Sequence, residues 1–115
     1  MINNYFLVHK NEKLNSIVEK ILINGHRAVI VVEKNKKVLG SISEGDILKS
    51  ILYKKIINTT ASDLMNKSFK FLTTKNTDKI KKMFKNHLIT ILPVVNSNMI
   101  LKDLITLEQF LKSIK

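Results

Sequence analysis

The apolar residues of the first half alternate between the spacing of strands and that of helices. Residues 5–8 and 28–32 are short apolar runs, and the second, rich in β-branched residues, predicts a strand buried on both faces. Between them, apolar residues recur at helical spacing as far as Gly25, which suits a left-handed helix cap. A polar turn then precedes a strand at 38–42 and a helix from Ser43 to about Lys55. The predicted order is strand, helix, strand, strand, helix.

The second half repeats this order. Its predicted elements are a strand, a helix, two strands and a helix, at residues 69–72, 77–88, 90–95, 99–105 and 107–114. Because proline has no N–H to donate to a β-ladder, Pro93 should lie at a sheet edge or a bulge. Residues 60–65 predict one capped helical turn in a connection without proline or glycine. We therefore expect the halves to pack against each other.

The halves match at a constant offset with no gap. The offset pairs apolar residues with apolar residues and a hydroxyl with a hydroxyl: Phe6 with Phe69, Ile17 with Ile80, Ile42 with Ile105 and Ser43 with Thr106. A repeat that keeps its apolar spacing predicts two similar units that share a core about a pseudo-two-fold axis. We expect an α/β fold of the α+β type, one module of residues 1–115 with halves at about 4–57 and 62–115.

Composition narrows the function classes. With 44% hydrophobic residues the chain is globular, and no apolar run approaches the roughly 18 residues that span a membrane, so we expect a cytoplasmic protein. The absence of cysteine removes disulfides, thiolate metal sites and cysteine nucleophiles. The histidines are too scattered in sequence for a metal triad, so they are expected to be structural.

The net charge of +11 would favour polyanions such as nucleotides, nucleic acid or an acidic partner surface. Against nucleic acid, the aromatic residues are few and Arg27 is the only arginine. The sequence also lacks the pattern of a helix-turn-helix with a polar recognition helix. A solvated basic surface is therefore the favoured interpretation of the lysines.

Residues 40–47 combine the end of a predicted strand, a turn and the start of a helix. Ser43 and Asp46, three residues apart, would both face the first turn of that helix. The free amides and the helix dipole attract anions there. The same spacing fits a capping box, in which Ser43 caps the helix and Asp46 reaches back to its amide. Both interpretations stay open, and the arrangement occurs twice, because Thr106 repeats Ser43.

The chain resembles a pair of CBS domains, the Bateman module of adenine-nucleotide sensors, from about Phe6 to Ile114. The resemblance rests on four segments in the family's order and spacing: VLGSISEGDI at 38–47, ASDLM at 61–65, LPVV at 92–95 and ITLE at 105–108. It implies two clefts between the halves, each able to hold AMP, ADP, ATP or a related adenosine compound, with no cofactor required.

The resemblance assigns residues to the first cleft. It gives the ribose hydroxyls to Asp46 and the phosphate to Ser43, with walls formed by Ala28, Phe69, Ile89 and Thr90. A carboxylate is suited to a ribose diol, because charge-assisted hydrogen bonds are the strong ones. Phe69 also fits the core together with the other phenylalanines.

The second cleft departs from the family pattern. Gln109 replaces the carboxylate, and Asp103 stands where the family has a glycine. Thr106 would lie near the phosphate, with His26 and Arg27 at the mouth. Thr106 and Gln109 also fit a capping box. We expect this cleft to be weak or empty.

These features predict a non-enzymatic regulatory module that binds an adenosine nucleotide. The resemblance implies control of an attached or partner effector, such as a C-terminal sugar-nucleotide transferase, and a homodimer formed through the helices. One alternative is a structural dimerisation module whose clefts have decayed. The other is nucleic-acid binding through the lysines, which would weaken steeply with salt.

Overall fold

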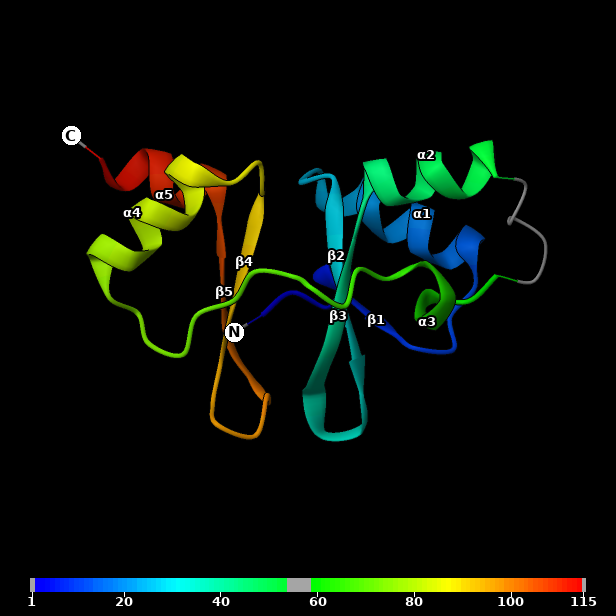
Figure 1. Ribbon diagram of the computed structural model, residues 1–115, viewed down its shortest axis with the longest axis horizontal. Coiled ribbons are helices and arrows are strands. Elements are labelled where there is room, and N and C mark those ends of the chain that lie inside the picture. Colours follow the sequence, from blue (N-terminus) through cyan, green and yellow to red (C-terminus); the bar gives the residue numbers. More distant parts are fainter. Residues whose placement is uncertain (1, 54–58, 115) are drawn as a thin grey trace.

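Two β-hairpins stand side by side in the middle of the molecule, and a pair of helices covers each of them on its outer side (Figure 1). The computed structural model describes residues 2–53 and 59–114. The first half contains β1 (Leu7–His9), α1 (Leu14–Asn24), β2 (Ala28–Glu33), β3 (Lys37–Ser43) and α2 (Glu44–Leu52). The rest contains α3 (Ala61–Leu64), α4 (Thr77–Asn86), β4 (Ile91–Val95), β5 (Leu101–Thr106) and α5 (Leu107–Ser113).

The first half has the predicted order of elements. β1 pairs parallel with β2, and β2 pairs antiparallel with β3. α1 ends at Gly25, whose φ of 71° is left-handed and whose N–H donates to the carbonyl of Ile21 (3.1 Å), as predicted. The predicted strand at 5–8 begins only at Leu7, because residues 4–6 form a 3-10 turn. The predicted helix end near Lys55 lies outside the described residues.

In the second half, the predicted strand at residues 69–72 is wrong. Within the described residues, this segment forms only an isolated parallel bridge, between Leu72 and Val94. Leu72 N donates to the carbonyl of Pro93 (3.0 Å), and Val95 N donates to the carbonyl of Leu72 (2.8 Å). Extending this ladder backwards would need an N–H on Pro93, which proline lacks. Pro93 therefore lies at the edge of the β4–β5 sheet, as the sequence predicted.

The repeat is visible in the structure at the predicted offset. β2 begins at Ala28 and β4 at Ile91, two positions that the offset pairs. Each of these strands pairs antiparallel with the next, and each pairing has a register shift at the same place, between residues 31 and 32 and between residues 94 and 95. α2 begins at Glu44 and α5 at Leu107, which the same offset pairs.

One core joins the two halves. It contains buried side chains from both sheets: Leu7, Ala28, Ile30, Val38, Ile91, Val95, Leu101 and Leu104. The hairpins also meet through their backbones, because Val38 N donates to the carbonyl of Met99 (2.8 Å). Smaller clusters lie between the first sheet and its helices and between the second sheet and its helices. This shared core is the arrangement that the repeat predicts.

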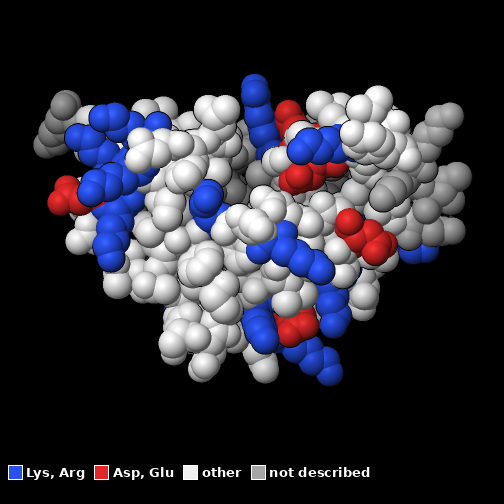
Figure 2. Space-filling model, viewed as in Figure 1, with Lys and Arg blue, Asp and Glu red and all other residues white. Residues whose placement is uncertain are grey.

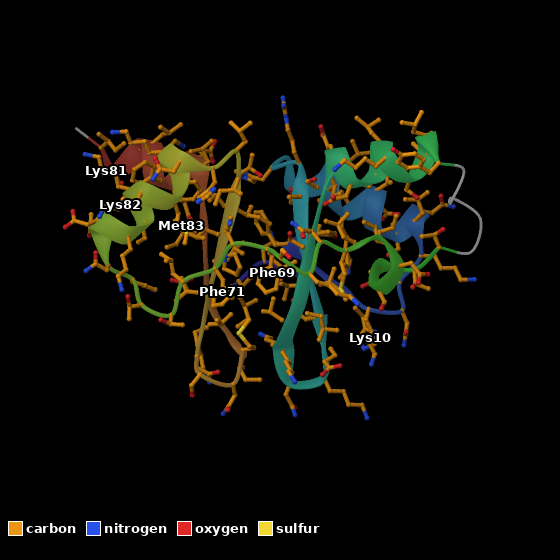
Figure 3. All side chains as sticks on the ribbon, in the orientation of Figure 1. Lys10, Phe69, Phe71, Lys81, Lys82 and Met83 are labelled. Atoms are coloured by element: carbon orange, nitrogen blue, oxygen red, sulfur yellow. The ribbon has the colours of Figure 1, made fainter. Side chains whose placement is uncertain are left out.

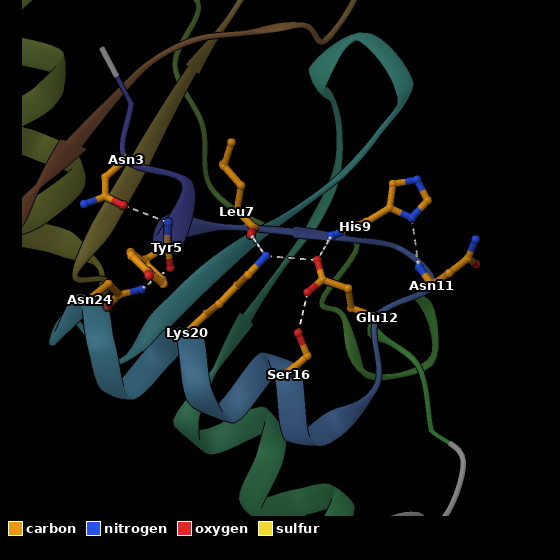
Figure 4. A network of polar contacts seen from close by, with 9 residues as sticks. All are labelled: Asn3, Tyr5, Leu7, His9, Asn11, Glu12, Ser16, Lys20 and Asn24. Atoms are coloured by element: carbon orange, nitrogen blue, oxygen red, sulfur yellow. Dashed lines mark hydrogen bonds and ion pairs between the residues drawn. The ribbon is translucent and has the colours of Figure 1, made fainter.

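A polar network around Glu12 ties β1 to α1 (Figure 4). The Glu12 carboxylate accepts hydrogen bonds from the His9 backbone N–H (2.6 Å), the Lys20 ammonium (3.1 Å) and the Ser16 hydroxyl. Lys20 also donates to the carbonyl of Leu7 (2.8 Å). Burial by itself raises the pKa of Glu12, but the hydrogen bonds from Ser16, His9 and Lys20 outweigh it and leave the pKa below its ordinary value.

We expect Glu12→Gln to lower the free energy of unfolding by about 1–2 kcal/mol at pH 7. Because the folded-state pKa is lowered, this stabilisation is complete above the ordinary glutamate pKa and is lost as the pH falls through the lowered value. Urea denaturation between pH 3 and pH 7 should therefore show the variant and the wild type converging at acid pH. Glu19→Gln, on the exposed side of the same helix, is the control and should leave the pH profile unchanged. A constant difference at every pH would contradict the role of the charge.

Candidate functional site

The first cleft lies where α2 begins, between the two halves, and encloses a cavity of about 330 Å³. One wall is the first turn of α2 with the end of β3, and the facing wall is residues 88–91 of the second half. Of the six residues assigned to this cleft from sequence, four line it: Ala28, Ser43, Ile89 and Thr90. Arg27 and Lys70 supply positive charge at its surface. The cleft therefore combines apolar walls with two cations, the carboxylate of Glu44 and a helix start.

Asp46 forms the capping box that its spacing predicts. Its Oδ2 accepts hydrogen bonds from the Ser43 backbone N–H (2.9 Å) and the Ser43 hydroxyl (3.1 Å). Ser43 Oγ in turn accepts from the Asp46 N–H (3.3 Å). Asp46 does not line the first cleft; it lines a separate hollow of about 630 Å³ with Lys49 and Tyr53. Its assignment to the ribose stays a prediction.

Phe69 belongs to the core rather than to the lining of the first cleft. Its ring lies 5.4 Å from that of Phe71, centroid to centroid, and both rings pack against the core shared by the halves. Figure 3 shows the two side chains on the segment that crosses between the halves. The neighbouring Lys70 is the residue of this segment that lines the cleft.

The second cleft is the counterpart of the first in the repeat and encloses about 450 Å³. His26 and Arg27 line it, as assigned, together with Thr90, Glu108 and Lys112. The last helix of each half, α2 or α5, donates its first N–H to the residue just before the first strand of that half's hairpin. Glu44 N donates to the Arg27 carbonyl (3.1 Å), and Leu107 N donates to the Thr90 carbonyl (2.7 Å).

The structure does not bring Thr106 and Gln109 into the second cleft. Their capping box is formed, with Thr106 N donating to Gln109 Oε1 (2.9 Å) and Gln109 N donating to Thr106 Oγ1 (3.0 Å). Both residues line a separate hollow of about 280 Å³, beside Asp103. Lys112 is the lysine that lines the second cleft. In the sequence, the only sign of this is its position about one turn after the start of α5.

Gly40 and its repeat counterpart Asp103 have different surroundings. A Cβ on Gly40 would lie 2.8 Å from the Asn66 carbonyl oxygen and 3.0 Å from Met65 Cβ, so the connecting segment packs directly on β3. Asp103 instead forms an ion pair with Lys75 and accepts the N–H of Leu104 (2.8 Å). Burial raises the pKa of Asp103, but the bonds from Lys75 and Leu104 outweigh it, so the pKa lies below its ordinary value.

Among the residues that the structure describes, the lysines do not gather around the clefts. Figure 2 shows a group of them over α4, which carries Lys79, Lys81, Lys82 and Lys85, and Figure 3 labels two of these at the outer end of the molecule. Over the described residues, no group of histidine and acidic side chains is arranged to hold a metal ion. None of the helices in residues 2–53 and 59–114 has the length and hydropathy needed to cross a membrane.

Comparisons with known proteins agree with this fold. Residues 1–53 match the family model of the CBS domain. No curated protein sequence matches the chain. The fold is similar to that of CBSX2 in complex with AMP, with a TM-score of 0.79 and 18% identity over 93% of this chain and 84% of that one.

Two further solved structures are similar. CbpB in complex with c-di-AMP gives a TM-score of 0.74 and 21% identity over 94% of this chain and 75% of that one. OpuCA of Staphylococcus aureus gives 0.71 and 21% over 93% of this chain and 89% of that one. At these identities the likeness concerns the fold. Residues 1–53 therefore belong to the CBS domain family, and the chain as a whole has the mixed α/β fold of a CBS domain pair.

Proposed function

We propose that the chain is a non-catalytic regulatory module that binds an adenosine nucleotide, AMP, ADP or ATP, with the first cleft as its stronger site. The observation that carries this proposal is the composition of that cleft. Ala28 and Ile89 offer apolar surface from the two halves, and Arg27 and Lys70 offer cations beside the start of α2. The purine ring of a nucleotide needs the apolar surface, and its phosphate needs the cations.

The size and the helix start of the cleft suit such a ligand. Its volume of about 330 Å³ falls at the lower end of the range of small-molecule sites, which begins near 300 Å³. Ser43, Glu44 and Gly45 line it with the positive end of the α2 dipole. CBSX2 was solved with AMP and CbpB with c-di-AMP, so nucleotides bind to proteins of this fold. These facts support a nucleotide over an uncharged ligand.

We expect AMP to raise the unfolding temperature of the protein, and the rise to grow with the logarithm of the AMP concentration above its Kd. A ligand that binds only the native state adds about 2.7 kcal/mol of stability at one hundred times its Kd. Differential scanning fluorimetry and isothermal titration calorimetry with AMP, ADP, ATP and adenosine measure this directly. Inosine monophosphate keeps the ribose and phosphate and tests the base. If no adenosine compound shifts the transition or releases heat, the module has no nucleotide function and the structural alternative holds.

Asp46 and Asp63 form a matched pair for testing the ribose assignment. Asp63 makes the same capping box in α3: its Oδ2 accepts the N–H (3.1 Å) and the hydroxyl (3.0 Å) of Thr60. Replacing either by alanine should lower the free energy of unfolding by about 1 kcal/mol. Both carboxylates line the same hollow outside the first cleft, so the ribose assignment is what separates them: it predicts that only Asp46→Ala also costs about 1.5–3 kcal/mol of AMP affinity, through a lost charged hydrogen bond. Equal AMP affinities of the two variants would leave Asp46 as a cap alone.

The proposal extends to assembly and control. The helices of the first half expose Leu22 on α1, and Leu48 and Leu52 on α2, at 65–73% of their surface. Such side chains suit a homodimer formed through the helices. In that dimer, nucleotide binding would control an attached or partner effector, for example a sugar-nucleotide transferase. Analytical ultracentrifugation with and without AMP tests the dimer and its response to the nucleotide, since a monomer at micromolar concentration would contradict the dimer.

A further inference from the structure

The two clefts share one wall. Arg27 and Thr90 line both cavities, and the offset of the repeat pairs them, so each is the counterpart of the other. The lysines of the clefts are not shared. Lys70 lines the first cleft only, and Lys112 lines the second only. Among the described residues, Arg27 is therefore the one strong cation that both clefts have in common.

Hydrogen bonds hold the shared wall from both sides. The start of α2 donates to the Arg27 carbonyl, and the start of α5 donates to the Thr90 carbonyl. The Thr90 hydroxyl also donates to the carbonyl of His26, which connects the second half to the first. Each segment is therefore bound to one helix, and the Thr90–His26 bond joins the two segments, so the shared wall connects the start of α2 to the start of α5.

The backbone of Arg27 is strained. Its φ of 65° lies in the left-handed region, which residues with a Cβ seldom adopt. Gly25, two residues earlier, has a similar φ without that cost. A strained residue that keeps a large side chain at a cleft suggests that the side chain has a function. The Arg27 side chain is exposed, and it is the only guanidinium in the chain.

We propose that Arg27 is the anion-selecting residue of both clefts, so that a phosphate bound in one cleft lowers the phosphate affinity of the other. This rests on the proposed nucleotide function. A guanidinium binds a phosphate through a planar fork of parallel N–H donors. Once one phosphate occupies that fork, a second phosphate meets a neutralised cation and the first phosphate's charge across the shared wall. Adenosine, which carries no phosphate, should bind the two clefts independently.

An NMR titration separates the clefts. The amide of Gly45 reports on the first cleft and that of Glu108 on the second. For the wild type with AMP, we expect the second cleft to fill with an affinity at least about fivefold weaker once the first is occupied. Adenosine should show no such dependence. In Arg27→Gln, AMP should behave like adenosine: weaker at both clefts and independent.

Lys70→Gln and Lys112→Gln are the matched controls. Each removes a cation from one cleft, so each should weaken AMP there only and keep the coupling between the clefts. The inference is overturned by two equal and independent AMP sites in the wild type, by coupling that persists in Arg27→Gln, or by binding of both AMP and adenosine at a single cleft. Failure of AMP and adenosine to bind at either cleft overturns the proposed function itself, and this inference with it.

Discussion

Replacing Gly40 by alanine is expected to lower the free energy of unfolding by about 2–3 kcal/mol. The added Cβ would lie 2.8 Å from the carbonyl oxygen of Asn66. That carbonyl is held in place, because it accepts the Ser41 N–H (3.2 Å) while Asn66 N donates to the Ser41 carbonyl (2.7 Å). The backbone must therefore separate or the two bonds must lengthen. Urea denaturation followed by circular dichroism measures the loss.

Gly45→Ala is the control for this prediction. A Cβ on Gly45 would meet only Ser43 Oγ, at 3.6 Å, and Gly45 lies in the first turn of α2. Since alanine favours helix more than glycine does, this variant should be neutral or more stable by up to about 1 kcal/mol. Equal effects of the two substitutions would show that the close approach of the connecting segment to β3 does not constrain Gly40.

Ile30→Ala should cost about 3 kcal/mol, the usual scale for removing a buried isoleucine side chain from a core. Ile30 is fully buried in β2, between Leu7 of β1 and Ser41 of β3, and it belongs to the core that both halves share. Because that core joins the halves, the whole molecule should still unfold in one transition with an unchanged m-value. Leu88→Ala removes a fully exposed leucine and should change stability by less than about 0.5 kcal/mol.

The outcome that would contradict the shared core is a separation of the halves. If Ile30→Ala unfolded in two steps, with the second half keeping wild-type stability, the contacts between the sheets would carry little energy. A loss below about 1 kcal/mol would lead to the same conclusion, because it would mean that the side chain's apolar neighbours contribute little.

Much of the fold could be predicted because its signals are local. Gly25 ends α1, and the hydroxyl-to-N3 spacing at Ser43 and Thr106 marks two helix starts; all three are formed as predicted. The constant offset of the repeat then predicted which residues of the second half correspond to those of the first. The strand at 69–72 failed for a non-local reason. Its partner would be β4, where Pro93 lacks the N–H that the ladder requires.

The clefts were only partly predictable. Ser43 and Thr90 lie in the first cleft because each is fixed by an element boundary. Asp46 lies three residues after Ser43, and Gln109 lies three residues after Thr106. Because the helix turns over that distance, each of the two side chains lines a hollow outside the clefts. Arg27's presence in both clefts depends on the packing of the halves, which no stretch of sequence encodes by itself. Four of the six residues that the resemblance assigned to the first cleft line it, and the assignment omitted the lysines that line the two clefts, Lys70 and Lys112.

The most direct test of the central claim is a titration of the isotopically labelled protein with AMP, followed by amide NMR. We expect saturable chemical-shift changes at four residues that line the first cleft. Ser43, Glu44 and Gly45 belong to the first half, and Thr90 belongs to the second. Shifts confined to the hollow at Lys49 and Tyr53, or no saturable shifts at all, would contradict a nucleotide site between the halves.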